Sequence, residues 1–257
     1  MIYVNGDSHS AGAEIINGYC FANDDPRYLT YGRQPHPEAL IKTYGYQIAQ
    51  TFDQGFFCDA QSGSSNARIL RTTKKFLEKT KDLSTIGFVI IGWTSWEREE
   101  WKDKEDFVQI SASGTDSVPE YMAEDYKRWV IQQTPKEHER KKQYWYDCIW
   151  NLHYELQEKK VRHLFFHTTN NLDYEKDFGV HYVPISFSQW LTEQNFRHKK
   201  NTNHFDSSAH SAWAGLLSKQ IMRTFTSQGH GQGSGLTTTE RSSILYKITK
   251  EFKGLKR

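Results

Sequence analysis

The sequence predicts an α/β fold, with a mostly parallel sheet of about five strands and helices on both faces. Short apolar runs alternate with longer segments of helical spacing, which is the order typical of parallel strands joined by helices. The run at 86–93 is almost continuously apolar, as expected for a buried strand. A length of 257 residues suffices for one large α/β domain, or for one domain with an appendage.

Each expected element follows from this alternation. Apolar runs predict strands at 2–4, 55–58, 86–93, 161–167 and 181–185. Helical spacing predicts helices at 37–52, 66–81, 135–160 and 207–225. Pro135 fits the first turn of its helix, because the N–H that proline lacks has no helical partner there. The helix at 207–225 carries an apolar stripe at helical spacing.

Two polar segments, 14–36 and 96–133, interrupt the pattern as insertions, and we expect the second to cover part of the site. The Gly/Ser-rich composition of 227–237 predicts a flexible linker after a domain at 1–226. The remaining 238–257 form a basic, helix-like tail. This tail could dock on the domain, on another subunit, or on nothing.

Charge and cysteine content narrow the class of protein. The 33 basic and 31 acidic side chains leave a formal charge of +2, so we expect no nucleic-acid partner. Cys20, Cys58 and Cys148 lack metal-ligand spacing, which predicts a reduced protein without disulfides, metal or other cofactor. No apolar run approaches the ~20 residues that cross a bilayer, and the first residues enter a strand directly. We therefore expect a cytoplasmic protein without a membrane partner. The sequence does not indicate its oligomeric state.

A serine follows the first expected strand. The strand at 2–4 breaks at Gly6, and Asp7-Ser8 suits the first turn of a helix. Backbone N–H groups and the helix dipole favour negative charge at such a position. Ser8 is therefore either a nucleophile with part of its oxyanion hole built in, or an N-cap. Polar residues also follow two further strand ends, at 62–66 and 92–95, where ligands bind in parallel sheets.

Four blocks together resemble the SGNH (GDSL-type) hydrolase superfamily, and more nearly its variants among bacteriophage and marine phage proteins. They are Gly6-Asp7-Ser8, Ser-Gly-Ser-Ser-Asn at 62–66, Ile-Gly-Trp-Thr-Ser at 91–95 and His-Phe-Asp-Ser-Ser-Ala-His at 204–210. The resemblance implies a flavodoxin-like three-layer sandwich. It also implies a serine esterase or deacetylase that hydrolyses an acyl ester, with an O-acetyl group on a carbohydrate as the expected substrate. For a phage protein it would further imply association with the virion.

The resemblance assigns roles to individual residues. Ser8 would be the nucleophile and His204 its general base, with the N–H groups of Ser8 and Gly63 in the oxyanion hole. Asn201 stands where the family has an aspartate, three positions before the histidine. An asparagine can accept a hydrogen bond from imidazole Nδ1–H, but it cannot stabilise the imidazolium by charge.

The third block also departs from the family pattern, Gly-x-Asn-Asp. Thr94 stands at the position of the oxyanion asparagine, so a hydroxyl of Thr94 or Ser95, or the amide of Asn66, would have to rebuild that donor. We name Asp7, Ser95 and Arg98 as candidate substrate contacts; a solvated charge is the alternative explanation of the arginine.

Three neighbouring residues have simpler interpretations. We expect His9 to point away from the site, His210 to make a structural hydrogen bond, and Asp206 to cap the helix that starts at 207. Two alternatives to the hydrolase stay open. One is a binding or phage structural module in which Asn201 and Thr94 are signs of lost catalysis. The other is an acyltransferase, which would use the same acyl-enzyme.

Overall fold

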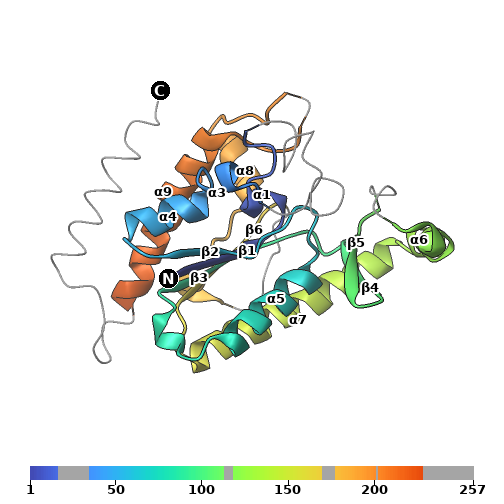
Figure 1. The fold of residues 1–257 in the computed structure, drawn as a ribbon, viewed down its shortest axis with the longest axis horizontal. Helices are drawn as coiled ribbons and strands as arrows, with labels where there is room; N and C mark the ends of the chain where they lie inside the picture. Colours follow the sequence, from blue (N-terminus) through green and yellow to red (C-terminus); the bar gives the residue numbers. More distant parts are fainter. Residues whose placement is uncertain (17–34, 113–117, 170–176, 201, 228–257) are drawn as a thin grey trace.

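The computed structural model describes residues 1–16, 35–112, 118–169, 177–200 and 202–227, and has a mixed α/β fold (Figure 1). Four parallel strands form the main sheet in the order β2-β1-β3-β6. Their bounds are β1 Ile2–Gly6, β2 Phe56–Cys58, β3 Phe88–Trp93 and β6 His163–His167. These strands confirm four of the five predicted runs, with ends shifted by one or two residues.

The register of the sheet brings the carboxyl ends of its central strands to one edge. Gly6 of β1 pairs with Gly92 of β3, and Trp93 pairs with His167 of β6. The residues that follow these strands therefore start from neighbouring positions. The first candidate block and the third meet at this edge, as the parallel order predicts.

Helices lie on both faces of the sheet (Figure 1). On one face are α1 Ser8–Ala11, α3 Pro37–Leu40, α4 Tyr44–Thr51, α8 Phe187–Glu193 and α9 Ser207–Ser227. On the other are α5 Asn66–Lys79 and α7 Pro135–Glu158. Short 3-10 turns are η1 Leu83–Thr85, η3 Glu120–Met122 and η4 Gly179–His181.

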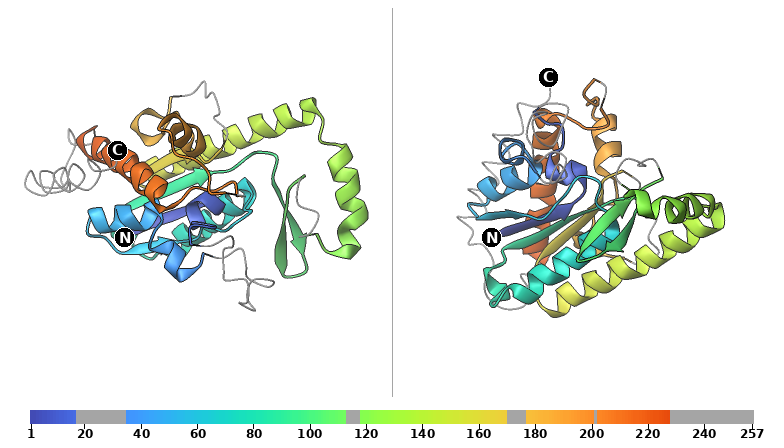
Figure 2. Two further views of the ribbon diagram at one scale, coloured as in Figure 1. Left: turned by 90° about the horizontal axis from the view of Figure 1, so that it is seen from above. Right: turned by 45° about the vertical axis from the view of Figure 1, so that its right-hand side comes forward.

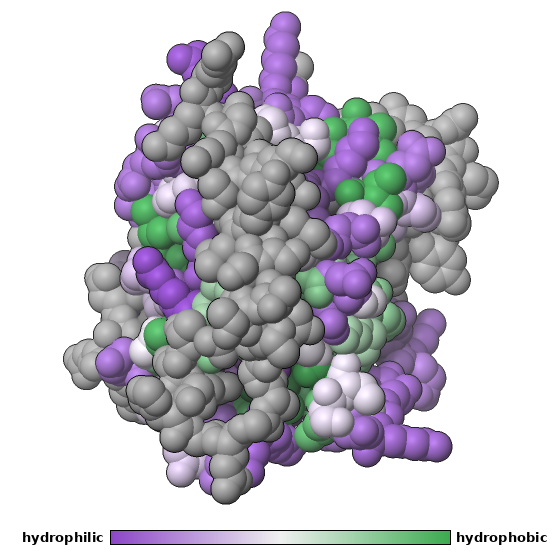
Figure 3. All heavy atoms as spheres, turned by 90° about the vertical axis from the view of Figure 1, so that its left-hand side faces the viewer, coloured by the Kyte–Doolittle hydropathy of each residue, from purple (hydrophilic) through white to green (hydrophobic). Residues whose placement is uncertain are grey.

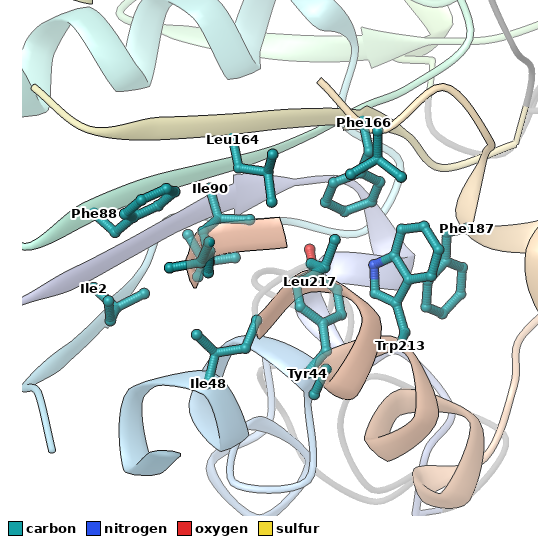
Figure 4. Close-up of a cluster of buried hydrophobic side chains, with 14 of the residues drawn as sticks. Ile2, Tyr44, Ile48, Phe88, Ile90, Leu164, Phe166, Phe187, Trp213 and Leu217 are labelled. Atoms are coloured by element: carbon teal, nitrogen blue, oxygen red, sulfur yellow. The ribbon is translucent and has the colours of Figure 1, made fainter. Parts of the chain in front are cut away.

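Alternate residues of the strands face two separate cores. Ile2, Ile90 and Leu164 pack against α4, α8 and α9, and Figure 4 shows this cluster around Trp213 and Leu217. Tyr3, Val89 and Phe165 instead pack against α5 and α7. Because both faces are covered, the central strands read as continuous apolar runs in the sequence.

Two predicted elements differ from the structure. The helix predicted at 37–52 is broken into α3 and α4, because the Thr43 side chain caps a new helix by accepting from Tyr46 N–H at 3.4 Å. The fifth strand predicted at 181–185 is wrong for the described residues. There the chain turns through η4, makes a single parallel bridge from Tyr182 to Phe165, and enters α8 at its cap Ser186.

The insertion at 96–133 builds an arm, which we define as this segment without its undescribed residues 113–117. It holds the antiparallel hairpin of β4 Glu99–Asp103 and β5 Asp106–Ile110, followed by η3 and α6 Ala123–Ile131. A small core of Ile110, Tyr126 and Trp129 joins hairpin to helix. Figure 2 shows the arm and the start of α7 projecting from the sheet.

Several predictions concern parts that lie partly or wholly outside the described residues. These parts are most of the 14–36 insertion, the linker at 227–237 and the tail at 238–257, so the division into domain, linker and tail stays a prediction. Within the described part of the chain, no helix is both long and apolar enough to cross a bilayer. On the face of the molecule that Figure 3 shows, the coloured atoms belong to both hydrophilic and hydrophobic residues.

Candidate active site

The turn from β1 into α1 fixes the position of Ser8. Gly6 allows the end of β1 to lie close to both α1 and β3, because a Cβ there would lie 2.2 Å from Ser10 Oγ and 2.8 Å from Gly92 O. Asp7 is the N-cap of α1, and its Oδ1 accepts from His9 N–H at 3.0 Å. Ser8 is thus the first residue of the helix rather than its cap. Its side chain starts at the edge where β1 and β3 end.

Asp7 ties three strand ends together. It is fully buried, and its Oδ2 accepts from Thr94 Oγ1 at 2.9 Å and from Thr168 Oγ1 at 2.8 Å. Arg98 Nη1 lies 3.6 Å from the same oxygen. Burial alone would raise the pKa of Asp7, but the neighbouring His9, the charge of Arg98 and these hydrogen bonds hold it below its usual value. Both oxygens of Asp7 are bonded within the protein and no part of the residue is exposed, so the residue has a structural role here, and its contact with a substrate stays a prediction.

His204 lies against the segment that carries Ser8. Its ring centroid is 4.8 Å from that of His9, the residue after the serine. Its Nδ1 lies 2.7 Å from Glu14 Oε2. Among the described residues, no hydrogen bond joins Ser8 Oγ to an imidazole. The predicted nucleophile and base thus occupy one region, without a direct contact in this structure.

His9 departs from the sequence-based expectation, because its side chain faces His204 and not away from it. The ring also packs on Phe187 at a centroid distance of 5.2 Å. Burial lowers the pKa of His9 to about 4, so this imidazole is neutral at neutral pH. Its Nδ1 is buried and has no hydrogen-bond partner among the described residues. His9 therefore places a neutral imidazole ring beside His204, the predicted base.

The predicted oxyanion donors are only partly oriented for that role. The second block lies in the loop that leads from β2 into α5, which we call the second loop. Within it Gly63 adopts a left-handed φ of 75°. Asn66 and Thr94 bind each other reciprocally: Thr94 N–H donates to Asn66 Oδ1 at 2.9 Å, and Asn66 Nδ2 donates to Thr94 O at 3.1 Å. The hydroxyl proton of Thr94 goes to Asp7, and Ser95 Oγ donates to Glu97 at 3.2 Å.

The consequence is that Thr94 and Ser95 would have to turn their hydroxyl protons before either could serve an oxyanion. Asn66 retains one amide N–H outside its bond to Thr94. The backbone N–H groups of Ser8 and Gly63 have no hydrogen-bond partner within the described part of the chain. The two backbone donors therefore fit the predicted hole better than the two hydroxyl groups do.

Arginines surround the second loop. Arg98 Nη1 donates to Ser64 O at 3.3 Å while it faces Asp7, so this guanidinium bridges the first and second blocks. Arg68 donates to Asp59 O at 2.8 Å. Arg71 forms a bidentate pair with Glu100 of β4, at 2.9 and 2.7 Å. Arg68 and Arg71 are thus structural.

The neighbours of His204 in the last block have structural roles, as predicted. Asp206 Oδ1 accepts from Ala209 N–H at 3.0 Å and caps α9. His210 Nδ1 accepts from Tyr44 N–H at 3.4 Å, and the two rings stack. Asn201 lies outside the described residues. His204 Nδ1, the atom that Asn201 is predicted to bind, lies 2.7 Å from Glu14 Oε2, and the role of Asn201 stays a prediction.

Sequence reasoning missed Glu14 and Lys199. Glu14 follows the C-cap Gly12, a left-handed residue that ends α1 and turns the chain back toward the site. Lys199 Nζ donates to Glu14 O, and also to Ile15 O at 3.3 Å. An acidic residue just after a helix-ending glycine was the one available signal. In the described ranges, no group of three His, Cys, Asp or Glu side chains could hold a metal ion.

Comparison with known proteins adds little to this geometry. No protein-family model matches the chain, and no curated protein matches it. Among solved structures it is similar to a crystal structure of a "putative GDSL-like lipase" from Parabacteroides merdae. The two are 12% identical, and the alignment covers 99% of this chain and 95% of that one, with a TM-score of 0.29. A TM-score this low does not establish a shared fold, so the functional argument depends on the site itself.

Proposed function

We propose that this protein is a serine ester hydrolase of the SGNH type, with a flavodoxin-like three-layer arrangement, and that it removes an acyl group through an acyl-enzyme on Ser8. The observation that carries the proposal is the placement of His204. Its imidazole lies 4.8 Å from the ring of the residue after Ser8, and its Nδ1 is held by a carboxylate. An imidazole held at Nδ1 presents Nε2 as the base.

The reaction would proceed in two balanced steps. Ser8 Oγ attacks the ester carbonyl carbon while its proton passes to His204 Nε2. Backbone N–H groups of Ser8 and Gly63 receive the oxyanion. The tetrahedral intermediate expels the alcohol, which takes the proton from His204. Water then attacks the acyl-enzyme in the same manner and releases the carboxylic acid and free Ser8.

An O-acetyl ester, on a carbohydrate, is the substrate class that we propose by analogy with the family resemblance. A small acyl group suits a nucleophile that is only 6% exposed. The aromatic content of 14% fits a sugar-binding surface as well as a packed core. We further propose that the protein acts in the cytoplasm, or on the virion if it is a phage protein.

One observation favours the second candidate, a binding or phage structural module on the same fold. Ser8 Oγ makes no hydrogen bond to an imidazole among the described residues, as expected if catalysis had been lost. Catalytic hydrogen bonds are, however, often long without a bound substrate and tighten when it binds. The carboxylate on His204 is the stronger observation, because the 2.7 Å contact is short, mostly buried and beside the residue that follows Ser8.

Replacement of Ser8 tests the proposal. Wild-type protein is expected to hydrolyse 4-nitrophenyl acetate and to be labelled by a fluorophosphonate at Ser8, as identified by peptide mass spectrometry. Ser8→Ala should lose at least about a thousandfold in kcat/KM while its circular dichroism spectrum stays unchanged. Ser84→Ala, on the exposed turn η1, is the matched control and should keep full activity. Wild-type protein that neither turns over the ester nor takes the label would favour the binding module.

A further inference from the structure

We infer that Glu14 is the positioning residue of His204, and that Lys199 holds the two together. This inference rests on the proposed function and names a residue that the sequence pattern did not. The carboxylate of the site would come from the turn after α1, 190 positions before the histidine. It would not come from the loop that carries the histidine, where the chain has Asn201.

The first step is the contact itself. Glu14 Oε2 and His204 Nδ1 are 2.7 Å apart, the short distance typical of a charge-assisted hydrogen bond. The carboxylate can only accept, so Nδ1 carries the proton and donates it. This fixes the tautomer in which Nε2 has a free lone pair. The bond also fixes the rotation of the ring, and thereby the direction of Nε2.

The second step is the charge on Glu14. Burial opposes ionisation, but the hydrogen bond with His204 and the charge of Lys199 bring the pKa of Glu14 below its usual value. Glu14 is therefore ionised at neutral pH. The side chains of His204 and Glu14 are only 16% and 22% exposed, so water screens the pair weakly. An imidazolium formed during the reaction is stabilised by this charge.

The third step is how the chain holds Glu14. Its φ of 62° is in the left-handed region, which is strained for a residue other than glycine. Lys199 Nζ compensates by donating to Glu14 O and to Ile15 O. The backbone N–H of the same lysine donates to His204 O at 2.9 Å. Lys199 thus binds the backbone of both partners.

Thr202 completes the loop around the base. His204 N–H donates to Thr202 Oγ1 at 3.2 Å, and the hydroxyl donates to His204 O at 3.2 Å. These bonds hold the backbone of His204 against the Thr202 hydroxyl. Together with Lys199 they support the position of the imidazole beside Glu14, and a base needs such a defined geometry.

Glu14→Gln is the central variant, because it keeps an acceptor of the same length and removes the charge. We expect kcat/KM for 4-nitrophenyl acetate to fall about 100-fold to 10,000-fold, mainly through kcat. KM should stay nearly unchanged, because Glu14 acts on the base and not on the bound ester. Glu14→Asp keeps the charge and should recover part of the loss in kcat. Glu193→Gln, on the exposed end of α8, should change neither kcat nor KM.

Lys199→Met separates positioning from charge. It should lower kcat about 10-fold, a smaller loss than in Glu14→Gln, because the carboxylate of Glu14 remains beside the ring. Lys200→Met, at the neighbouring exposed lysine, is its matched control and should behave as wild type. Circular dichroism spectra and thermal melting check that each variant folds.

A second readout is independent of catalysis. Proton NMR of the wild type should show a downfield Nδ1–H resonance of His204, which moves upfield in Glu14→Gln and is absent from a His204→Gln reference. Wild-type activity in a Glu14→Gln variant would overturn the inference, as would a resonance whose position this substitution does not change. If the wild type lacks both hydrolysis and Ser8 labelling, the proposed hydrolase fails. The NMR comparison then still decides whether Glu14 holds His204.

Discussion

Gly6 lets the chain turn from β1 into α1 close to β3, and so places Ser8 at the edge of the sheet. A methyl group at this position would come within 2.2 Å of Ser10 Oγ and 2.8 Å of the backbone oxygen of Gly92. Such distances force α1 away from β3. The displacement would carry Ser8 with it, because the serine is only two residues further along the chain.

Gly6→Ala is therefore expected to lower the free energy of unfolding by about 2–3 kcal/mol, measured by urea denaturation. Its kcat/KM should fall more than 10-fold even where the protein is fully folded. Gly55→Ala is the matched control, because the nearest atom to its added Cβ is 4.0 Å away. Equal behaviour of the two variants would disprove the steric argument.

At the same scale, the sequence predicts the site residues that sit at fixed offsets from strand and helix ends. Ser8, Gly63 and His204 are of this kind. Glu14 and Thr168 are not, since each acts through a side-chain contact that spans more than 150 positions. Thr94 was located correctly at the end of β3, but a single hydroxyl proton cannot be assigned without knowing that Asp7 lies beside it.

At the scale of elements, the arm supports the second loop of the site. Gln109 of β5 is buried, and its Oε1 accepts from Ser65 N–H, the N-cap of α5, at 2.8 Å. Its Nε2 donates to Glu100 Oε1 at 2.8 Å, and Glu100 in turn binds Arg71 of α5. The hairpin is thereby fixed to the helix that follows Gly63.

Gln109→Leu should leave the Ser65 N–H buried without an acceptor, at a cost of about 1–3 kcal/mol in the free energy of unfolding. Because Ser65 is two residues from Gly63, kcat for 4-nitrophenyl acetate should also fall. Gln143→Leu, exposed on α7 with weak contacts of 3.5 Å to Asp147, should stay within about 0.5 kcal/mol of wild type. The idea that the arm supports the loop fails if activity is unaffected in a destabilised Gln109 variant.

Elements differ in how far the sequence determines them. The four strands of the sheet and helices α5, α7 and α9 follow from apolar periodicity, because each buries a long, regular face. The expected strand at 181–185 has little apolar length, and the cap Ser186 ends it before a second bridge can form. The arm was recognised only as an insertion, since its hairpin is held by Arg71 and Gln109 and not by an apolar pattern.

At the scale of the whole molecule, buried histidines make stability depend on pH. Burial lowers the pKa of His9 and His153 to about 4, and that of His167 and His210 to about 3. His163 belongs to the same set, because its Nδ1 donates to Val161 O at 2.9 Å and its Nε2 then accepts from His153 Nδ1 at 2.8 Å. Protonation of His163 would place its Nε2–H directly opposite the Nδ1–H of His153, where the two would repel each other.

These pKa values are lower in the folded chain than the usual 6.5, so the unfolded chain binds more protons below that pH. The stabilisation is fully present above pH 6.5 and is lost as the pH falls toward about 4. Each such histidine adds about 1.4 kcal/mol per pH unit to the slope. Urea unfolding between pH 6.5 and about 5.5 reports mainly this effect, because the carboxylates of the folded and of the unfolded chain remain mostly ionised there.

His153→Gln tests the assignment, since glutamine retains a donor for His163 but takes up no proton. The free energy of unfolding should then fall less steeply over that interval, by about 1 kcal/mol per pH unit. Between pH 7 and about 8 the slopes of the two proteins should converge, because His153 is then mostly neutral in both the folded and the unfolded chain, which provides the internal reference. A slope identical to that of wild type would show that His153 is protonated equally in folded and unfolded chains, and that the cluster of His153 and His163 does not set acid stability.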